Sequence, residues 1–455
     1  MITARLAQHI ATARERELPA DVLEKVTLHV LDTVAAMVSG VHLPAGEKIL
    51  PFVASMTPSG SASVIGGGSA SPTFAALANG MLAHADETDD SHAPSLTHPG
   101  CAVVPAALAV GEHIDASGRD LLRAVTAGYD VGPRISSALG GDRFFDRHHG
   151  SHAFGGLFGA VAAGSALACA NAAQSAAALA YAVQMASGNS CWRRDPDHVE
   201  KAFDFGGMPA QAGTLAGLMA ADGFTGSHEP IEGTPGLFAA FPEEADPSRA
   251  TDGLGERYCV METAIKRWCV GSPIQAALDS LESLMAEFGF GAADVERVQV
   301  DLPRQSAPVV DDRDMPAVNL QHQLALMLLD GTVTFVSGHD LQRMGDPTVV
   351  ALRARIGITP RYEQEYIDFP RQAVVTATLC DGRVLSRRTQ HVRGTPRNPM
   401  TTAEVVGKSR GLMIPVVGEH RANSIVAAVM GLHGATSARG LGQLLRQTSN
   451  GSDRA

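Results

Sequence analysis

The chain has 455 residues, more than a single compact core usually holds, so we expect two domains. Hydrophobic residues make up 45% and charged residues 18%, as in an ordinary globular protein, and the formal net charge is −12. This negative charge argues against nucleic acid or an anionic membrane surface as a partner. The six cysteines are widely spaced and include no CxxC pair, so we expect thiols in a reducing cytoplasm.

Two segments bear on targeting and membrane insertion. The amino-terminal segment MITARLAQHIATARERELP is amphipathic and has no apolar core, so it is not typical of a secretory signal. The segment Gly155–Val183 is largely apolar, but it consists mostly of Ala and Gly and is interrupted by Asn171 and Gln174. We interpret it as two small-residue helices packed tightly in a soluble core.

Helical patterns dominate the chain up to about residue 290. Asp21 and Glu24 form a capping arrangement at the start of a helix that ends at Gly40. Ser71 as N-cap and Pro72 at the first helical position predict the start of another helix. Further helical patterns follow in four segments: Cys101–His113, Gly118–Leu139, Gly155–Met185 and Met208–Met219. Residues 221–260 are predicted to be irregular, with a short helix near Leu237, so this part of the chain is mainly α.

The pattern changes after Lys266. Alternating residues predict a strand over Val295–Leu302, and Asp-Gly between two alternating runs predicts a hairpin over residues 371–392. Helices are expected over residues 273–288 and 320–329, and again over 402–412 and 423–431. We therefore predict a mainly α protein with a large all-helical domain, residues 1–263 and 397–455, and a smaller α+β domain, residues 264–396.

The segment Asn79–Gly100, NGMLAHADETDDSHAPSLTHPG, concentrates titratable groups at the end of an apolar helix. It contains four carboxylates and three histidines: Asp86, Glu87, Asp89, Asp90, His84, His92 and His98. Burying these groups is costly unless each finds a partner. One interpretation is a core helix that delivers an acid and histidine loop into a cleft. The other is a solvated acidic turn with incidental histidines, and this segment alone does not separate them.

Four further clusters contain groups that could do chemistry: RHHGSH at residues 147–152, EKAFDFGG at 200–207, AIKRWCVGSPIQ at 264–275 and NLQHQ at 319–323. Taken singly, a lysine such as Lys201 is usually solvated, and a histidine such as His322 is usually a helix cap or a satisfied core group. Taken together, histidines and lysines of these clusters could form a cationic pocket: His98, His152, Lys201 and Lys266.

Such a pocket suits a small di- or tricarboxylate. An ammonium about 4 Å from a carboxylate is worth on the order of 4 kcal/mol at a partly screened site. The same groups would stabilise the charge that forms when a proton next to a carboxylate is removed by a histidine or carboxylate base.

Other chemistries have less support. The chain has no Walker loop, no G-x-G-x-x-G after a strand and no G-x-S-x-G elbow. A metal site is the main rival, because several competent ligands are close in sequence: His84, Asp86, Asp89, His92 and His98, with His148, His149 and His152 as further candidates. Their spacing matches no metal signature, so we expect no metal and no other cofactor.

The segment Asn79–Gly100 resembles the NG…H…DFDD(T)…HP(S)G segment of the MmgE/PrpD family. That family includes 2-methylcitrate dehydratase, cis-aconitate decarboxylase and iminodisuccinate epimerase. Five further segments resemble its motifs in the same order: GSHAFGGLFGAVAAG, EKAFDFGGMPAQAG, AIKRWCVGSPIQAALD, LALMLLDGTVT and VRGTPRNPMT. The resemblance implies that the α+β domain is a lid, that the protein is a homodimer, and that a metal-free active site lies between domain and lid.

Carried over by position, the family's active-site residues fall on Glu87 (or Asp86, by register), Ser91, His98, His152, Lys201, Lys266 and His322. The chain departs from the family pattern at four of the lining positions: Glu87 stands for Asp, Ser91 for Thr, Gln275 for His and His322 for Tyr. The loop from Ser91 to His98 is also one residue longer. These changes suggest a branch with its own substrate.

We therefore predict a cofactor-independent lyase acting on a small polycarboxylate or hydroxy acid. Catalytic roles are expected for Glu87, Asp90, His98, His152, Lys201, Lys266 and His322, and substrate-binding roles for Asp86, Ser91, Arg267 and Gln275. Dehydration, as in 2-methylcitrate dehydratase, is favoured because the pocket has histidines to spare as acids. Decarboxylation and epimerisation share the same first step and stay open, as do a metal-dependent hydrolase and a non-catalytic binding protein.

Overall fold

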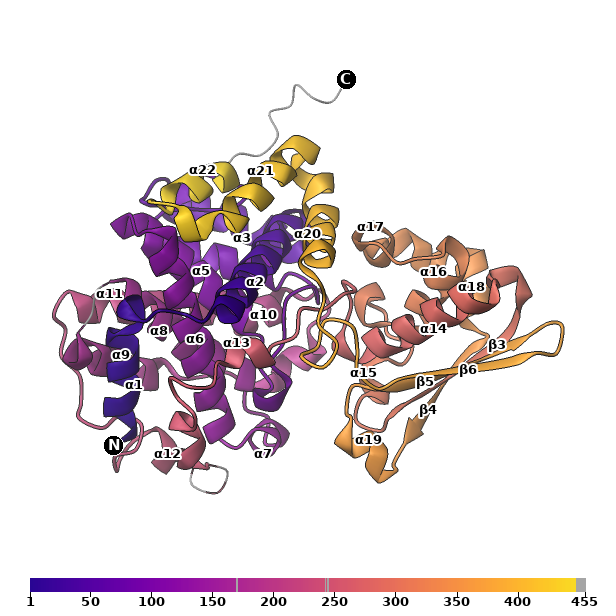
Figure 1. The fold of residues 1–455 in the computed structure, drawn as a ribbon, viewed down its shortest axis with the longest axis horizontal. Coiled ribbons are helices and arrows are strands. Elements are labelled where there is room, and N and C mark those ends of the chain that lie inside the picture. Colours follow the sequence, from indigo (N-terminus) through magenta and orange to yellow (C-terminus); the bar gives the residue numbers. More distant parts are fainter. Residues whose placement is uncertain (169–170, 242, 244, 447–455) are drawn as a thin grey trace. The chain divides into compact units, whose positions relative to one another are not determined.

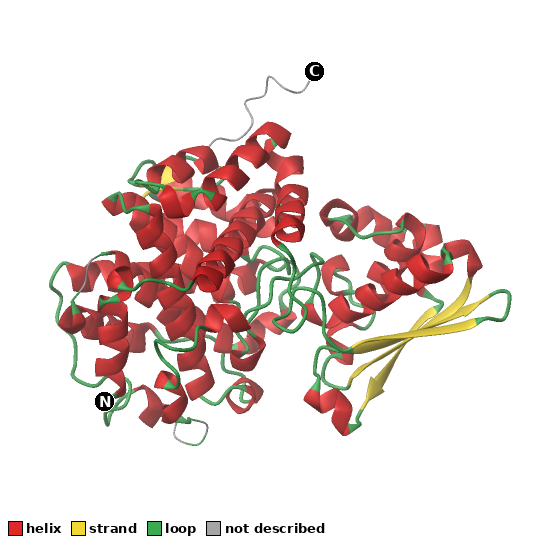
Figure 2. Ribbon diagram, in the orientation of Figure 1, coloured by secondary structure: helices red, strands yellow, loops and turns green. Residues whose placement is uncertain are grey.

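The computed structural model describes residues 1–168, 171–241, 243 and 245–446. The chain forms two compact units (Figures 1 and 2). The first contains Met1–Ala85, Asp89–Ala264 and the described residues of Thr402–Ala455, and the second contains Asp86–Thr88 and Ile265–Thr401. The fold is mainly α with a smaller α+β unit, as predicted. The sequence did not reveal that residues 86–88 group with the second unit.

The first unit is built of helices. In chain order they are α1 (Ile2–Ala11), α2 (Ala20–Ser39), α3 (Pro44–Met56), α4 (Pro72–Ala83), α5 (Pro99–Ile114), α6 (Gly118–Ala138), α7 (Asp142–Asp146), α8 (Ser151–Leu167), α9 (Ala172–Met185), α10 (Val199–Ala202), α11 (Met208–Ala221), α12 (Leu237–Ala240), α13 (Cys259–Glu262), α20 (Thr402–Val417), α21 (Glu419–Met430) and α22 (Arg439–Arg446). A π-helical turn, η5 (Phe203–Gly207), joins α10 to α11. Two-residue strands β1 (Ala62–Ser63) and β2 (Ser69–Ala70) form a small ladder that the sequence did not predict.

Helix α8 is the centre of this unit and packs against α5, α6 and α11. Its small residues allow this close packing: a Cβ atom on Gly132 of α6 would lie 2.3 Å from the carbonyl oxygen of Gly155, and one on Gly213 of α11 would lie 2.4 Å from the Cβ of Ala160. The prediction of two tightly packed small-residue helices is confirmed in α8 and α9, although Cys169 and Ala170 between them lie outside the described residues.

The carboxyl-terminal helices α20, α21 and α22 belong to the first unit. In Figure 1 the yellow helices α20 and α21 lie beside the indigo helix α2. Lys408 Nζ donates to Asp32 Oδ1 at 2.6 Å, and both side chains are buried. Burial raises the pKa of Asp32 to about 6, although Lys408 opposes the shift. The capping arrangement expected at Asp21 and Glu24 is wrong: no side chain caps α2, and Glu24 accepts a hydrogen bond from Thr402 instead.

The second unit combines a four-stranded sheet with helices. Its strands are β3 (Val295–Pro303), β4 (Ile356–Arg361), β5 (Ala373–Leu379) and β6 (Val384–Thr389), in the order β4-β3-β5-β6. Its helices are α14 (Gln275–Phe288), α15 (Ala307–Val310), α16 (Leu320–Asp330), α17 (Phe335–His339), α18 (Pro347–Arg353) and α19 (Gln364–Asp368). The expected hairpin is present as β5 and β6, with Gly382 at φ 88° in the turn.

The sheet of the second unit buries one face. Buried residues alternate along β5, as the pattern predicted, and α14 packs on β5 and β6 (Figure 2). Strand β4 was not predicted, because Gly357 and Pro360 interrupt any alternation. It pairs parallel to β3 at the edge of the sheet, where a proline is tolerated.

Among the described helices, none is by itself long and apolar enough to cross a membrane, and one bent pair, Ala20–His42 with Pro44–Met56, passes that test by length and composition only. The five described cysteines form no disulfide with one another, and Cys169 lies outside the described residues.

Candidate active site

Asp89 binds two histidines at the point where α4 gives way to a loop. His84, the C-cap of α4, donates from Nδ1 to Asp89 Oδ2 at 2.9 Å, and His98, the N-cap of α5, donates from Nδ1 to Asp89 Oδ1 at 3.1 Å. The carboxylate is fully buried. The segment Asn79–Gly100 is therefore the buried acid and histidine loop of the first interpretation, and not a solvated turn.

Asp90 anchors the backbone beside it. Its Oδ2 accepts from His29 Nδ1 at 2.6 Å and from the Tyr129 hydroxyl at 2.5 Å, and its Oδ1 accepts from the backbone N–H of Gly100 at 3.0 Å. Burial alone would raise the pKa of Asp90, but the hydrogen bonds from His29 and Tyr129 outweigh it and lower the pKa. Both oxygens of Asp90 are therefore engaged, one of them with the first turn of α5, and Asp90 holds the loop in its orientation. This geometry favours an orienting role for Asp90 over a role as proton acceptor.

The histidines gather around the ring of Phe205, which lies in the π-helical turn. His84 stacks on Phe205 with ring centroids 4.3 Å apart, and His152, from the first turn of α8, stacks on it at 3.9 Å. His98 lies 5.5 Å from the same ring and 5.3 Å from the ring of His152. Turns of this kind are frequent at functional sites.

Two glycines explain why Phe205 reaches this place. A Cβ atom on Gly206 would lie 2.1 Å from the carbonyl oxygen of Gly80, and one on Gly80 would lie 2.4 Å from the carbonyl oxygen of Gly206. The π-helical turn therefore lies directly on the backbone of α4. This contact fixes the ring of Phe205 beside the histidine at the end of that helix.

Two of the histidines are neutral near pH 7. Burial lowers the pKa of His84 to about 3, although Asp89 opposes the shift. Burial, assisted by His98 and Lys201, lowers the pKa of His152 well below its usual value. Within the described part of the chain, His84 Nε2 and His152 Nδ1 have no hydrogen-bond partner. These rings can therefore contribute hydrogen bonds or shape to a site, but not positive charge.

Lys201 supplies the positive charge. Its Nζ lies 5.2 Å from the ring centroids of both Trp192 and Phe205, which is a cation–π distance. Its backbone N–H donates to Asp195 Oδ2 at 2.8 Å, at the start of α10. The residue before α10, His198, has the left-handed conformation with φ 64°, and its ring lies 5.1 Å from that of His84. Strained residues of this kind cluster at functional sites.

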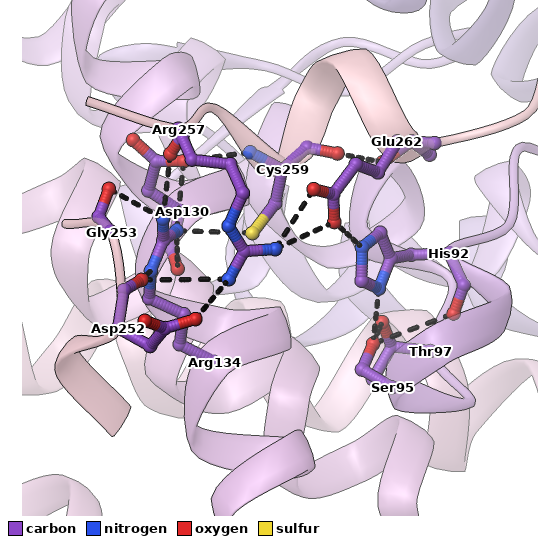
Figure 3. Close-up of polar contacts among 11 residues, drawn as sticks. His92, Ser95, Thr97, Asp130, Arg134, Asp252, Gly253, Arg257, Cys259 and Glu262 are labelled. Atoms are coloured by element: carbon purple, nitrogen blue, oxygen red, sulfur yellow. Dashed lines mark hydrogen bonds and ion pairs between the residues drawn. The ribbon is translucent and has the colours of Figure 1, made fainter. Parts of the chain in front are cut away.

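A separate polar network holds the loop that leads to His98 (Figure 3). His92 bonds Ser95 Oγ through Nδ1 at 2.7 Å and Glu262 Oε2 through Nε2 at 3.3 Å, while its backbone pairs with that of Thr97. Arg257 donates to both oxygens of Glu262, at 2.8 and 3.0 Å. The hydrogen bond from His92, followed by those from Arg257, lowers the pKa of Glu262 to about 2. His92 therefore holds the loop between residues 92 and 97 in a fixed conformation.

The atoms of His92, Cys259 and Glu262 lie within 4.8 Å of one another and could form a cation site by distance alone. However, Arg134 donates to Cys259 Sγ at 3.0 Å, beside the guanidinium already bound to Glu262 (Figure 3). Burial raises the pKa of the Cys259 thiol to about 12, so it is not a thiolate. A protonated thiol between two guanidinium groups is a poor cation site.

A second group with metal-ligating atoms within 4.8 Å of one another consists of His84, Asp89 and His98. The donor set, two imidazoles and a carboxylate, suits zinc or iron. In this structure the same atoms satisfy one another through hydrogen bonds, so an ion would have to replace the protons on both Nδ1 atoms.

In the second unit, Lys266 is buried and binds the backbone of the acidic segment. Its Nζ donates to the carbonyl oxygen of Glu87 at 2.7 Å and lies 3.9 Å from Glu87 Oε2. Both residues were predicted to be catalytic, and the structure brings them together. Residues 86–88 belong to the same unit as Lys266.

Asp86 is occupied by local partners. It accepts from the backbone N–H and the hydroxyl of Thr88 at 2.9 and 2.6 Å, and His339 Nε2 lies 2.9 Å from its Oδ2. His339 Nδ1 also donates to the carbonyl oxygen of Phe335 at 2.8 Å. Although burial lowers the pKa of His339, the contact with Asp86 outweighs burial and raises it. This geometry favours an anchoring role for Asp86.

Two residues expected to bind substrate have structural partners instead. Arg267 forms a bidentate pair with Glu282, at 2.6 and 2.7 Å, and its guanidinium stacks over the ring of Trp268. Gln275 accepts from the backbone N–H of Trp268 and donates to the carbonyl oxygens of Trp268 and Val270. These contacts hold the segment after Lys266 in shape and favour a supporting role for both.

His322 is buried, and neither ring nitrogen has a hydrogen-bond partner among the described residues. Burial, assisted by Arg353 and Arg343, lowers its pKa to about 4. The N-cap of α16 is Asn319, which accepts from the backbone N–H of His322. The ring is therefore neither a helix cap nor a satisfied core group, which were its two ordinary explanations.

Of the residues predicted for the first unit, the structure gathers His98, His152 and Lys201 around Phe205. Ser91 is half-buried, and its backbone pairs with that of Ala264. Sequence reasoning placed His84 and Asp89 in the acid and histidine loop and among possible metal ligands, but did not single them out as site residues. Their signal was a consecutive pair of acids beside histidines at the end of an apolar helix. Phe205 and Trp192 gave no such signal.

The chain matches two family models, the MmgE/PrpD N-terminal domain over residues 4–250 and the MmgE/PrpD C-terminal domain over residues 268–432. It is 26% identical to the cis-aconitate decarboxylase-like protein oryM of Aspergillus oryzae, covering 95% of this chain and 94% of that protein. It is 23% identical to the cis-aconitate decarboxylase of Aspergillus terreus, with 98% and 96% covered, and 25% identical to that of Homo sapiens, with 79% and 76% covered. The chain therefore belongs to the MmgE/PrpD family.

Proposed function

We propose that this lyase-type enzyme removes a carboxylate, as CO₂, from a small unsaturated polycarboxylate such as cis-aconitate. Two findings support the proposal. The curated relatives carry the name cis-aconitate decarboxylase, and the first unit gathers His98, on its carboxylate partner Asp89, and the ammonium group of Lys201 around the ring of Phe205. The second of these, the grouping of His98, Asp89 and Lys201, carries the proposal.

The protonation of the cluster favours decarboxylation over the dehydration suggested by the sequence. Dehydration needs a base for the proton and an acid for the departing hydroxide. The sequence suggested spare acids, but His84 and His152 have strongly lowered pKa values and are neutral. Decarboxylation needs only one proton donor at the carbon that loses CO₂ or at a carbon conjugated with it.

The steps follow from these groups. Lys201 would pair with a substrate carboxylate and stabilise the negative charge that develops as the C–C bond breaks and CO₂ leaves. His98, held by Asp89 at Nδ1, would give a proton from Nε2 to the carbon that receives the electron pair. Water would then return a proton to His98. His152 would hydrogen-bond the substrate as a neutral ring.

The test is incubation of the purified protein with cis-aconitate, citrate and 2-methylcitrate, followed by NMR of the products and measurement of released CO₂. The proposal expects CO₂ from cis-aconitate and a matching decarboxylated product. Loss of water from citrate or 2-methylcitrate without CO₂ would instead support dehydration, and inversion of configuration alone would support an epimerase. The exposed residue His420 provides a matched control: His420→Ala should retain activity that His98→Ala loses.

A metal-dependent hydrolase is a second candidate, favoured by one observation, the grouping of His84, Asp89 and His98 atoms within 4.8 Å. Elemental analysis of protein purified without added metal separates the two functions. Stoichiometric zinc, manganese or iron, with activity lost on chelation, would support the hydrolase. The roles expected for Glu87, Lys266 and His322, the lid function of the second unit, the homodimer and the cytoplasmic location stay predictions.

A further inference from the structure

The two oxygens of Asp89 bind two imidazoles that differ in their access to a substrate. Oδ2 faces His84 Nδ1 at 2.9 Å, and Oδ1 faces His98 Nδ1 at 3.1 Å. A carboxylate only accepts hydrogen bonds, so each ring must carry a proton on Nδ1. In a neutral ring, Nε2 is then the atom with the free electron pair.

The rings of His84 and His98 differ in their exposure and therefore in their roles. The His84 side chain is 0% exposed, so a substrate cannot reach it, and it donates to Asp89 at 2.9 Å. The His98 side chain is 12% exposed, which makes it the ring of this pair that a substrate can reach. The main chain around His98 is held separately, because Asp90 accepts from the backbone N–H of Gly100 two residues later.

We infer that Asp89 is a positioning residue that fixes the orientation and the tautomer of His98, and that His84 holds Asp89 in place by occupying its other oxygen. Asp89 thereby directs His98 Nε2 toward the substrate. Neither Asp89 nor His84 contacts the reacting atoms in this scheme. The inference rests on the proposed function only for its kinetic consequence, because the tautomer is a property of the unliganded protein.

The key variant is Asp89→Asn, which keeps the shape of the side chain. An amide presents one acceptor and one donor to the two rings, so it cannot accept from both. With the amide nitrogen facing His98, Nδ1 of that ring can only accept, so its one proton lies on Nε2, and giving that proton to the substrate would leave an unfavourable imidazolate. Losing the carboxylate partner of a catalytic histidine costs on the order of 10²–10⁴ in kcat. We expect a loss of that size, with KM for cis-aconitate changed less than about threefold because Lys201 is untouched.

The decisive readout is ¹⁵N NMR of protein labelled at histidine, recorded without substrate. Wild-type His98, assigned with the His98→Gln variant, should show a protonated Nδ1 and, when neutral, an unprotonated Nε2. Asp89→Asn should show the reverse, and Asp89→Glu should restore the wild-type tautomer and part of the lost kcat. A purely structural role for Asp89 would lower thermal stability without reversing the tautomer.

Three results would overturn the inference: a wild-type His98 protonated on Nε2 alone, an Asp89→Asn enzyme with wild-type kcat, or a loss of kcat with the tautomer unchanged. The first needs no variant, so it decides the matter even if Asp89→Asn does not fold. If wild-type protein turns over none of the tested polycarboxylates, the proposed function fails, while the NMR spectrum still decides the role of Asp89.

Discussion

Asp204 provides a stability prediction that can be worked out from the structure. It lies in the π-helical turn between Lys201 and Phe205, is 8% exposed, and its Oδ2 has no hydrogen-bond partner among the residues described. Burial, with a smaller contribution from the charge of Glu200, raises its pKa from 3.8 to about 7. The folded state therefore binds this proton more tightly than the unfolded state does.

The sign and size follow from this shift. A carboxyl group whose pKa rises on folding contributes its full stability below the unfolded pKa, and this contribution is lost as pH rises through the folded value, here about 7. At about 1.4 kcal/mol per pKa unit, ionisation of Asp204 in the folded state costs up to about 4 kcal/mol at high pH. Asparagine has nearly the same shape and no charge to desolvate. Asp204→Asn should therefore raise the free energy of unfolding by about 2–4 kcal/mol at pH 8.5 and by less, about 1–2 kcal/mol, at pH 5, because the loss builds up between pH 3.8 and about 7.

The assay is urea-induced unfolding of wild type and variant at both pH values, followed by circular dichroism. Asp222→Asn is the matched control, because Asp222 is exposed just after α11, and its effect should be similar at the two pH values. If the difference between wild type and Asp204→Asn were the same at both pH values, the buried carboxyl would not be the ionising group and the reasoning would be refuted.

Three further changes test other parts of the structure. Gly206→Ala would place a Cβ atom 2.1 Å from the carbonyl oxygen of Gly80, so the π-helical turn must move; we expect a destabilisation of roughly 1–3 kcal/mol, seen in urea unfolding, together with a loss of turnover. Lys408→Met removes the partner of buried Asp32 and should cost about 3–5 kcal/mol at pH 8, measured in the same way. Lys201→Ala should lower kcat/KM for cis-aconitate by roughly tenfold or more without changing the melting temperature by more than a few degrees.

Two of these changes have a control in the chain. Gly407 lies in α20, and a Cβ atom added there would meet no described atom within 4 Å, so Gly407→Ala should be neutral or stabilise by about 0.5–1 kcal/mol. Lys48 is exposed on α3, and Lys48→Ala should leave kcat/KM unchanged. If Lys408→Met had the same free energy of unfolding as wild type, the buried pair of Lys408 and Asp32 would not contribute the predicted stability. If Gly206→Ala kept both the wild-type stability and the wild-type turnover, the close backbone contact would not be needed.

The helices could be predicted because their causes are local. Periodic apolar residues gave α2, α5, α6 and α11 close to their observed bounds, and the Ala/Gly composition of α8 predicted its tight packing. Local patterns failed where a distant partner decides the structure. Strand β4 exists because β3 supplies its hydrogen bonds, and Glu24 binds Thr402 from the opposite end of the chain instead of capping α2.

The same distinction applies to the candidate site. Residue type and motif order pointed to His98, His152 and Lys201, and the structure brings these three together. The sequence could not show that burial makes His152 neutral, because that depends on packing by Phe205 from a turn more than fifty residues later in the chain. Nor could it show which acid binds which histidine, since Asp89 and Asp90 are neighbours with different partners.

The most direct test of the account is calorimetric titration of cis-aconitate into wild type, Lys201→Ala and Lys48→Ala. The account predicts saturable binding to wild type and to Lys48→Ala, and binding at least about tenfold weaker to Lys201→Ala, because the ammonium group would pair with a substrate carboxylate. Equal affinity for wild type and Lys201→Ala would contradict it, as would the absence of any binding to the wild-type protein.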